Sequence, residues 1–391
     1  MFTKNDTFEH ILQTGPVKRA IGNLFPTCWL ERIPPQHDTY TMHQIEAEDR
    51  MEWGEPFLSD AFVESANILM EADKNKRFLF IPLWNPDADS ADRQIPDADL
   101  NCADSVWLFT GNPDTDLTAF AHTAGAASIP PYPSDAVPAD RYTENALRPA
   151  VIICPGGGYE MLSSYSEGIQ LAQRMERDGG YKAFLLNYRI TPNYYPLPQM
   201  DLALAILHVR AFASRYQIDP DRILIIGSSA GGHLCASEAF LHEDLKQQVL
   251  SVLSDSDHTI NPAVLSRYQD CSARPDGIGL LYPVISFLSE YHEGSYLNLT
   301  GQQPGLREAL SVETHITPDY PPVYAFANED DGCVPVSNTK RLDHALCRAG
   351  VPHLCQIFPT GDHGVGLGYS CSCHTWSEQM LRFFEQELPA K

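Results

Sequence analysis

The stretch ILIIGSSAGGHL (residues 223–234) decides the fold, because an apolar run leads directly into a turn rich in glycine and serine. The run from Ile223 to Ile226 is typical of a strand buried on both faces of a parallel sheet. The turn fits Gly-x-Ser-x-Gly with Ser229 at its centre, and helical periodicity follows it. Between a strand and a helix this pattern is typical of a nucleophile elbow, although an exposed serine in a tight turn is the plain alternative.

Outward from this turn, the chain from Pro149 onward alternates apolar runs with helical periodicity. Val-, Ile- and Leu-rich runs separated by helices predict an α/β fold with a mostly parallel central sheet flanked by helices. Helices are expected after residue 200 and over 338–349, the second ending at Gly350. The other strands are expected at VIIC (151), AFLLNY (183), IGLLYP (278), VYAFA (323) and LCQIF (354).

The N-terminal part of the chain is less regular. It contains two segments with the Pro, Asp and Ser content of loops, residues 86–99 and 128–140. It also contains an amphipathic helix near 60–73 and two short strand-like runs, FLFIPLW (78–84) and SVWLFT (105–110). We expect an irregular accessory region over 1–104, serving as a lid, a packing element or an oligomerisation element, and a catalytic domain over 105–391.

Charge and composition narrow the class of function. Asp and Glu total 51 against 27 Lys and Arg, a formal net charge of -24. Such a charge repels the phosphates of nucleic acids and anionic lipid headgroups, so we expect neither a nucleic-acid nor a membrane partner. No apolar run approaches the roughly 18 residues of a membrane span, and no secretory leader is visible. The ten scattered cysteines suit free thiols, and we expect a cytoplasmic protein.

One cysteine pair is close in sequence. Cys371 and Cys373 stand beside His374, a combination that can ligate zinc. No second pair of ligands stands at the spacing of a zinc finger. We therefore expect a loop with incidental thiols and no metal site.

A glycine triplet follows the strand expected at 151. Gly156, Gly157 and Gly158 leave backbone N–H groups uncovered, able to face a developing oxyanion. A dinucleotide-binding loop would need a further glycine where Met161 stands. A flexible turn is the other alternative.

A serine nucleophile needs a base and an orienting carboxylate, expected in the chain order Ser, Asp, His. His363 lies in GDHG (361–364), directly after the strand expected at 354, although a surface histidine is the alternative. Asp330 and Asp331 both follow the strand expected at 323, and chemistry alone leaves the choice between them open.

The motifs resemble those of α/β-hydrolase esterases of the acetyl esterase and acetylxylan esterase-like (BD-FAE-like) group, which includes relatives described as feruloyl esterases. The family places its aspartate in an Asp-x-x-Val-Pro pattern, so the resemblance selects Asp331 over Asp330. It implies Ser229 as the nucleophile, His363 as the base and Asp331 as the orienting carboxylate. The resemblance rests on CPGGGY (154–159), NYR (187–189), GSSAGGHL (227–234), DDGCVPVSNT (330–339) and FPTGDHGVGL (358–367).

The same resemblance implies the surroundings of the nucleophile. The backbone N–H groups of Gly157, Gly158 and Ala230 would form the oxyanion hole. Tyr159 is placed to stack against a sugar ring or to cap the acyl pocket, and a core aromatic is the equal alternative. No cofactor is needed for this chemistry.

The expected activity is hydrolysis of short-chain acyl esters, acetyl above all, on carbohydrate hydroxyls such as those of acetylated xylo-oligosaccharides. The expected partner is therefore a small-molecule ester. The sequence leaves open whether the protein forms a homo-oligomer. A feruloyl esterase, a general carboxylesterase and a peptidase are alternatives, because the fold and the triad do not fix the leaving group. A non-catalytic binding protein on a hydrolase scaffold is a further alternative.

Overall fold

The computed structural model describes most of the chain, namely residues 1–20, 39–52, 59–74, 79–84, 107–110, 147–255, 260–303, 305–369 and 371–389. The two loop-like segments predicted at 86–99 and 128–140 lie outside these ranges.

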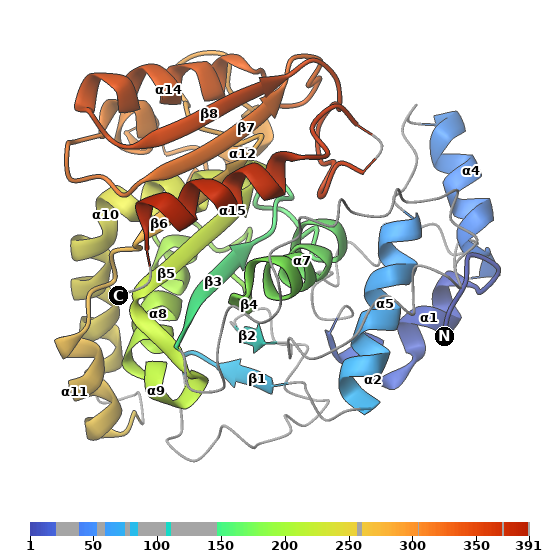
Figure 1. Cartoon of the computed structure of the whole chain (residues 1–391), viewed down its shortest axis with the longest axis horizontal. Helices are drawn as coiled ribbons and strands as arrows, with labels where there is room; N and C mark the ends of the chain where they lie inside the picture. Colours follow the sequence, from blue (N-terminus) through green and yellow to red (C-terminus); the bar gives the residue numbers. More distant parts are fainter. Residues whose placement is uncertain are drawn as a thin grey trace.

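An eight-stranded sheet forms the centre of the molecule, in the order β1-β2-β4-β3-β5-β6-β7-β8 (Figure 1). β2 pairs antiparallel with both β1 and β4, and all later pairs are parallel. Each strand predicted from an apolar run is confirmed, and the sheet is mostly parallel as expected. The strands are β1 (Leu79–Pro82), β2 (Trp107–Thr110), β3 (Arg148–Cys154), β4 (Lys182–Asn187), β5 (Ile218–Ser228), β6 (Gly277–Leu281), β7 (Val323–Asn328) and β8 (His353–Phe358).

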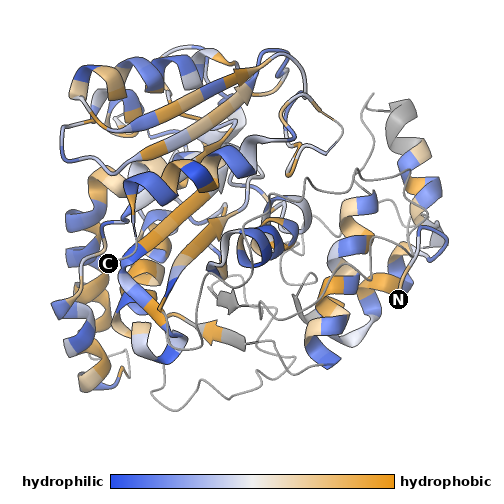
Figure 2. Ribbon diagram, viewed as in Figure 1, coloured by the Kyte–Doolittle hydropathy of each residue, from blue (hydrophilic) through white to orange (hydrophobic). Residues whose placement is uncertain are grey.

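Both faces of the sheet are apolar because side chains alternate along each strand. In β3, Ile152 belongs to one buried cluster, whereas Val151 and Ile153 belong to the other. Figure 2 shows the hydrophobic strands β3 and β5 at the centre of the molecule, between layers of helices with mixed surfaces. The continuous apolar run at 223–226 is thus explained by burial on two sides.

Helices cover the two faces of the sheet (Figure 1). The Ile152 face packs against α8, α10, α11, α12 and α14, and the Val151 face packs against α7 and α15. No helix in the described ranges has the length and apolar character to cross a bilayer. The elements are η5 (Tyr165–Ile169), α7 (Gln170–Gly179), α8 (Leu197–Ala211), α9 (Ala213–Tyr216), α10 (Ser229–Leu253), α11 (Pro262–Asp270), α12 (Glu293–Thr300), α13 (Leu306–Ala309), η6 (Val312–Thr314), α14 (Ser337–Ala349) and α15 (Trp376–Glu387).

The two helices predicted from periodicity are present as α8 and α14. The second ends as expected, because Gly350 follows it in the left-handed conformation with φ of +70°. The C-terminal end of α14 leads within a few residues into β8.

The N-terminal part is more helical than its sequence suggested. The amphipathic helix expected near 60–73 is confirmed as α5 (Ser59–Lys74), and α1 (Phe8–Gln13), α2 (Gly15–Ala20) and α4 (Met42–Glu52) accompany it. The described residues of this region are thus largely helical, whereas the loop-like segment at 86–99 lies outside the described ranges. Helices of six residues, such as α1 and α2, are too short to give a periodic signal.

These N-terminal helices share a core with the sheet. Phe62 of α5 is fully buried, and its ring lies 6.0 Å from that of Tyr165 in η5. Ser65 donates a hydrogen bond to the carbonyl of Tyr165 at 3.0 Å. Phe62 and its apolar neighbours belong to the same buried cluster as Val151 and Ile153 of β3.

The first strand also ties the N-terminal part to the sheet. β1 pairs with β2 in the register Leu79 to Thr110, so the boundary expected at residue 104 runs between two paired strands. Trp84, just after β1, donates a hydrogen bond from Nε1 to Oδ1 of Asp201 in α8 at 2.8 Å.

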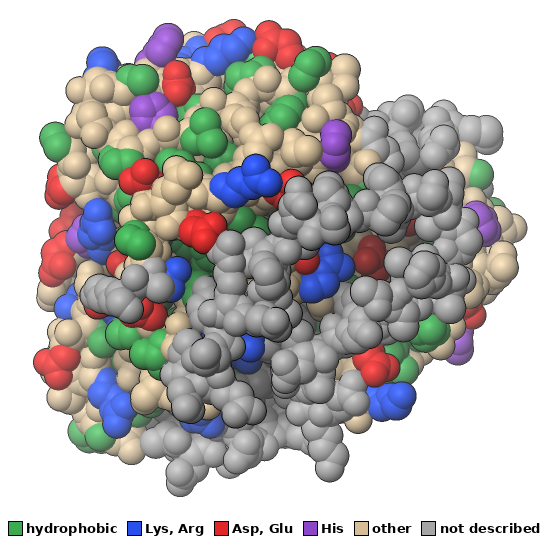
Figure 3. All heavy atoms as spheres, in the orientation of Figure 1, with side chains coloured by type: hydrophobic (Ala, Val, Ile, Leu, Met, Phe, Trp, Pro, Cys, Tyr) green, Lys and Arg blue, Asp and Glu red, His purple; other side chains and the backbone are tan. Residues whose placement is uncertain are grey.

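The described surface shows how the acidity is distributed. On the face drawn in Figure 3, acidic and basic side chains of the described residues are interspersed rather than gathered into patches of one sign. The described part of this face therefore carries no single acidic patch.

Candidate active site

Ser229 stands where a strand meets a helix, as predicted. It is the first residue of α10 and follows the last residue of β5. Its φ of +52° lies in the left-handed region, which a residue with a side chain occupies only when its surroundings hold it there. A Cβ atom on Gly227 would lie 2.1 Å from the carbonyl oxygen of Gly231. The flanking glycines are thus required by the close approach of strand and helix.

Three of the predicted site residues form one hydrogen-bonded chain. Oγ of Ser229 lies 2.9 Å from Nε2 of His363, and Nδ1 of His363 lies 2.8 Å from Oδ2 of Asp331. The Asp331 side chain is fully buried, and its Oδ1 accepts hydrogen bonds from the N–H groups of Cys333 and Val334. With Nδ1–H donated to Asp331, the neutral imidazole presents the lone pair of Nε2 to the serine hydroxyl.

Asp330 has a different position. Its Oδ1 accepts hydrogen bonds from the backbone N–H groups of Gly361 at 3.0 Å and Asp362 at 2.9 Å. In return, Oδ1 of Asp362 accepts the N–H of Gly332 at 3.0 Å. Asp330 therefore holds together the two loops that carry Asp331 and His363.

The glycine triplet lies against Ser229. A Cβ atom on Gly156 would lie 2.9 Å from Cβ of Ser229, so only glycine lets the two segments approach this closely. Gly157 and Gly158 have φ values of +125° and +62°, and their N–H groups have no acceptor in the described part of the chain. The N–H of Ala230, in the first turn of α10, has no intrahelical acceptor either. Uncommitted donors are thus available in both segments that meet at Ser229.

Tyr159 is not at the surface of the site. Its side chain is fully buried, and its hydroxyl lies 2.9 Å from Nδ1 of His233. Its ring packs edge-to-face against Tyr188 at 6.1 Å. The prediction that Tyr159 stacks against a sugar or caps the acyl pocket is therefore wrong, and the alternative of a core aromatic is confirmed. The buried hydroxyl needs a partner, and His233 provides it.

A buried carboxylate for which the sequence predicted no role connects the loops of the site. Glu167 accepts hydrogen bonds from the N–H of Gly156 at 2.7 Å and from the hydroxyl of Tyr282 at 2.8 Å. The Tyr282 hydroxyl in turn accepts the N–H of Gly366 at 3.0 Å, and its ring lies 4.9 Å from that of His363. Burial raises the pKa of Glu167, while the bond from Tyr282 and the nearby His363 lower it.

A second missed residue lies on the other side of the glycine loop. A Cβ atom on Gly158 would lie 3.6 Å from Cε1 of His292, and Asn298 donates a hydrogen bond to the carbonyl of Gly158 at 2.9 Å. Burial lowers the pKa of His292, and His363 lowers it further, while Asp331 opposes both. His292 is thus a half-buried imidazole within the electrostatic reach of the Asp331–His363 pair.

The Cys-x-Cys-His segment (371–374) lies beside the loop of His363. Its side chains do not form a cluster of metal-type donors in the described structure. Sγ of Cys371 lies 3.9 Å from the carbonyl oxygen of Gly361. The bond with Cys373 lowers the pKa of Cys371 to about 7. In the described ranges, the one group of three mutually close metal-type donors is formed by other residues, Asp343, Cys347 and His353.

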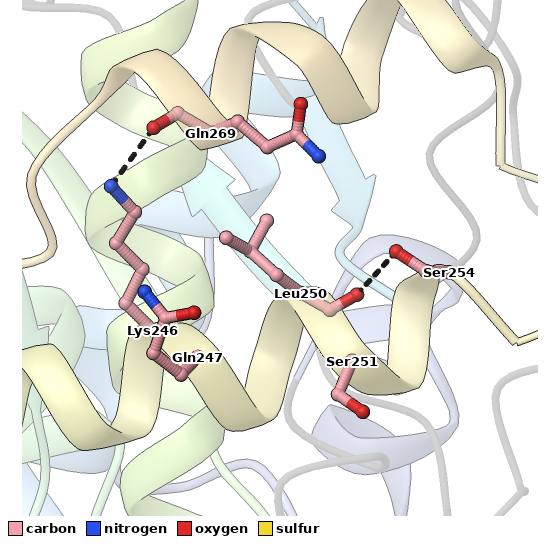
Figure 4. Close-up of a pocket in the computed structure, with 6 residues that line it drawn as sticks. All are labelled: Lys246, Gln247, Leu250, Ser251, Ser254 and Gln269. Carbon is pink, nitrogen blue, oxygen red and sulfur yellow. Dashed lines mark hydrogen bonds between the residues drawn. The ribbon is translucent and has the colours of Figure 1, made fainter.

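A surface hollow between α10 and α11 is separate from Ser229. Figure 4 shows its six lining residues, with a bond from Lys246 Nζ to the Gln269 carbonyl at 2.9 Å. Five of these residues lie at the C-terminal end of α10 or just beyond it, about 25–38 Å along the helix from Ser229 at a rise of about 1.5 Å per residue, and Gln269 lies on α11. The hollow therefore takes no part in the site. It is lined by Lys246, Gln247, Leu250, Ser251, Ser254 and Gln269.

Comparison with known proteins places this geometry in a family. The chain is 30% identical over 300 residues to endo-1,4-beta-xylanase B of Butyrivibrio fibrisolvens, covering 74% of this chain and 44% of that protein. It is 30% identical over 257 residues to an acetylxylan esterase of Xylanibacter ruminicola, covering 63% and 47%. The chain thus spans about half the length of the curated relatives that it matches.

A solved structure agrees with the sequence comparison. The acetyl ester-xyloside bifunctional hydrolase of Caldicellulosiruptor lactoaceticus is 30% identical, with a TM-score of 0.58 over 78% of this chain and 95% of that one. The fold is that of the α/β-hydrolases, as expected. The BD-FAE family model matches residues 138–346, more than half of the 391 residues. The chain therefore belongs to the BD-FAE family.

Proposed function

We propose that the protein is a serine esterase that removes short acyl groups, acetyl above all, from the hydroxyls of xylo-oligosaccharides. The observation that carries the proposal is the hydrogen-bonded chain from Asp331 through His363 to Ser229, next to a glycine loop with uncommitted N–H groups. The sugar class is supported by the relatives, two of which are described as an acetylxylan esterase and an acetyl ester-xyloside hydrolase.

Acylation begins with the attack of Ser229 on the ester carbonyl carbon. Nε2 of His363 takes the serine proton as the bond from Oγ to carbon forms, and Asp331 stabilises the resulting imidazolium. The carbonyl oxygen becomes an oxyanion, which accepts hydrogen bonds from the N–H groups of Gly157, Gly158 and Ala230. Preorganised donors contribute strongly to this step because they need no rearrangement when the charge develops.

The second half of the reaction regenerates the enzyme. His363 gives its proton to the departing sugar oxygen, the carbon–oxygen bond breaks, and the acyl group stays on Ser229. Water then attacks the acyl-enzyme while His363 takes one of its protons. His363 returns this proton to Oγ of Ser229 as the bond from Oγ to carbon breaks, and the carboxylic acid is released. The scheme uses only groups of the protein, the ester and water, and needs no cofactor.

We also propose that residues 105–391 carry the chemistry and that residues 1–104 act as a packed accessory element. The burial of Phe62 against Tyr165 and the pairing of β1 with β2 support packing over a hinged lid. Free thiols at all eight described cysteines fit a reducing compartment, and we propose that the enzyme acts in the cytoplasm.

Mass spectrometry of acetylated xylo-oligosaccharides, before and after incubation, tests the proposal. We expect stepwise loss of acetyl groups with the unaltered protein and none with Ser229→Ala. Feruloylated oligosaccharides, longer acyl esters and peptide amides in parallel distinguish the alternative activities. Turnover of peptide amides without turnover of acetylated sugars would refute the esterase assignment.

A further inference from the structure

Three side chains with the donor atoms of a metal site meet between α14 and β8, at the edge of the sheet. Asp343 and Cys347 are four residues apart on α14, so they lie on the same face of that helix. His353 is the first residue of β8. One carboxylate oxygen, the thiol sulfur and one ring nitrogen lie within 4.8 Å of one another.

The distances from His353 to the other two donor atoms match those around a tetrahedral ion. Nε2 of His353 lies 3.3 Å from Oδ1 of Asp343 and 3.4 Å from Sγ of Cys347. Bonds of about 2.0–2.3 Å from zinc to oxygen, nitrogen and sulfur place neighbouring donors about 3.3–3.6 Å apart at the tetrahedral angle. Both distances from Nε2 of His353 therefore already match those that a single ion would impose, and the donor atoms of Asp343 and Cys347 lie within 4.8 Å of each other.

The partners of two donors prepare them for an ion. Nδ1 of His353 lies 2.6 Å from the carbonyl oxygen of Val351, an acceptor, so Nδ1 carries a proton. In the neutral ring, Nε2 then presents its lone pair to Asp343 and Cys347. Cys355, two residues along β8, hydrogen-bonds the Asp343 carboxylate. Metal-ligating histidines and carboxylates are commonly oriented by such outer partners.

We propose that Asp343, Cys347 and His353 bind one Zn²⁺ ion, with water in the fourth position on the exposed side of Cys347. A thiolate and an imidazole favour zinc over magnesium or calcium, which prefer oxygen ligands. On binding, Cys347 gives up its proton to solvent and its sulfur donates an electron pair to the ion, with no change in oxidation state.

The ion would connect an edge strand of the sheet to the helix that covers it. The site lies at the start of β8, whereas the loop of His363 follows the other end, about 20 Å away at about 3.3 Å per residue. Its role is therefore to stabilise the α14–β8 pair rather than to take part in ester hydrolysis, and it does not depend on the proposed function.

Cobalt binding to the full chain, after removal of metals with a chelator, tests this site. Co²⁺ bound to a thiolate in a tetrahedral site gives a sulfur-to-cobalt charge-transfer band and intense visible bands. We expect saturation at one equivalent, displacement by Zn²⁺, and a zinc dissociation constant below about 1 μM. A folded protein that gives no charge-transfer band would overturn the proposal.

Variants locate the ion. Cys347→Ser should abolish the charge-transfer band, and His353→Gln should weaken Co²⁺ affinity at least about tenfold. The matched control is Cys371→Ser, which alters the other Cys- and His-containing cluster and should keep the band. A band that survives Cys347→Ser, or that disappears in Cys371→Ser, contradicts the assignment.

Thermal unfolding gives a second measurement. Zn²⁺ should raise the melting temperature of the unaltered protein by several degrees, because the ion binds only the folded arrangement. The same addition should leave the melting temperature of Cys347→Ser unchanged. Equal shifts in both proteins would mean that zinc binds elsewhere.

Discussion

The region around Ser229 and the region around Phe62 pack on the same sheet but are built from different interactions. Around Ser229, polar groups from several loops converge in hydrogen bonds that fix individual atoms. Around Phe62, apolar side chains fill space between helices and sheet. Polar convergence demands particular residue types at particular positions, whereas apolar packing accepts many sequences of similar volume. Chemistry should therefore depend on the first region and stability on the second.

Removing the hydroxyl of Ser229 gives the largest effect expected from this contrast. Ser229→Ala should lower turnover of acetylated substrates by about 10⁴- to 10⁶-fold, because the proposed nucleophile is lost. The free energy of unfolding should change by less than about 1 kcal/mol, since one oxygen atom is removed without altering the glycine turn. Kinetics and urea denaturation of the same sample measure both. Turnover close to that of the unaltered protein would exclude Ser229 as nucleophile.

Truncating Phe62 should show the opposite pattern. Phe62→Ala should lower the free energy of unfolding by about 3–5 kcal/mol, through lost burial and the cavity that remains. At temperatures where the variant is folded, kcat should be unchanged. Asp60→Asn, at an exposed position of the same helix, is the control and should cost less than about 1 kcal/mol. If the folded Phe62 variant loses activity, the N-terminal helices contribute to the site itself.

Glu167 sharpens the comparison because it is a buried group that would affect the chemistry only by positioning the glycine and histidine loops. Glu167→Gln keeps the size but puts an amide N–H₂ against one of two donors, either the Gly156 N–H or the Tyr282 hydroxyl. We expect kcat to fall about 10- to 100-fold, with KM nearly unchanged, as the glycine and histidine loops lose their common anchor.

The exposed Glu329 provides the control for this change. Glu329→Gln removes the same charge at the end of β7, where the carboxylate pairs only with the exposed Lys340 among the contacts described here. It should leave kcat unaltered. Equal kinetics for the Glu167 and Glu329 variants would mean that Glu167 does not position the site.

A second buried carboxylate tests whether burial alone signals a role in the chemistry. Both carboxylate oxygens of Glu238 in α10 have no hydrogen-bond partner in the described chain, and burial raises the pKa of this group well above its usual value. In the unfolded chain Glu238 ionises above about pH 4.3, whereas in the folded protein it stays protonated to a higher pH. The folded state therefore loses stability as the pH rises from about 4.3 toward the pKa of Glu238 in the folded protein.

Glu238→Gln should remove that pH dependence without affecting activity. The melting temperature of the variant should exceed that of the unaltered protein by an amount that grows from about pH 5 to pH 8. Parallel stability profiles for the two proteins over this range would contradict the expectation.

The sequence predicted the sheet and the Ser229 site for identifiable reasons. Five strands, β3 to β7, are continuous apolar runs because they are buried on two faces, whereas the edge strand β8 is partly exposed. The Gly-x-Ser-x-Gly turn needs its glycines for backbone approach. The choice of Asp331 over Asp330 came only through family resemblance. The structure brings Asp331 against His363, while Asp330 holds the two loops together.

What the sequence could not predict depends on contacts between distant positions. Glu167 accepts a hydrogen bond from Tyr282, which is 115 positions further along the chain. No local sequence pattern at either residue predicts this pairing. The sequence leaves Tyr159 open between the pocket and the core, since its φ of +58° and its bond to His233 become visible only in three dimensions. The short strand β1 was expected, but its place beside β2 in the main sheet was not.

The length of α10 has an electrostatic consequence for Ser229. The peptide dipoles of this 25-residue helix align to give roughly half a positive charge at its N-terminus, where Ser229 is the first residue. Any negative charge that develops on or beside Oγ is stabilised by this field without a lysine or arginine. A protein with a net charge of -24 can thus place a locally positive potential at one point by backbone orientation alone.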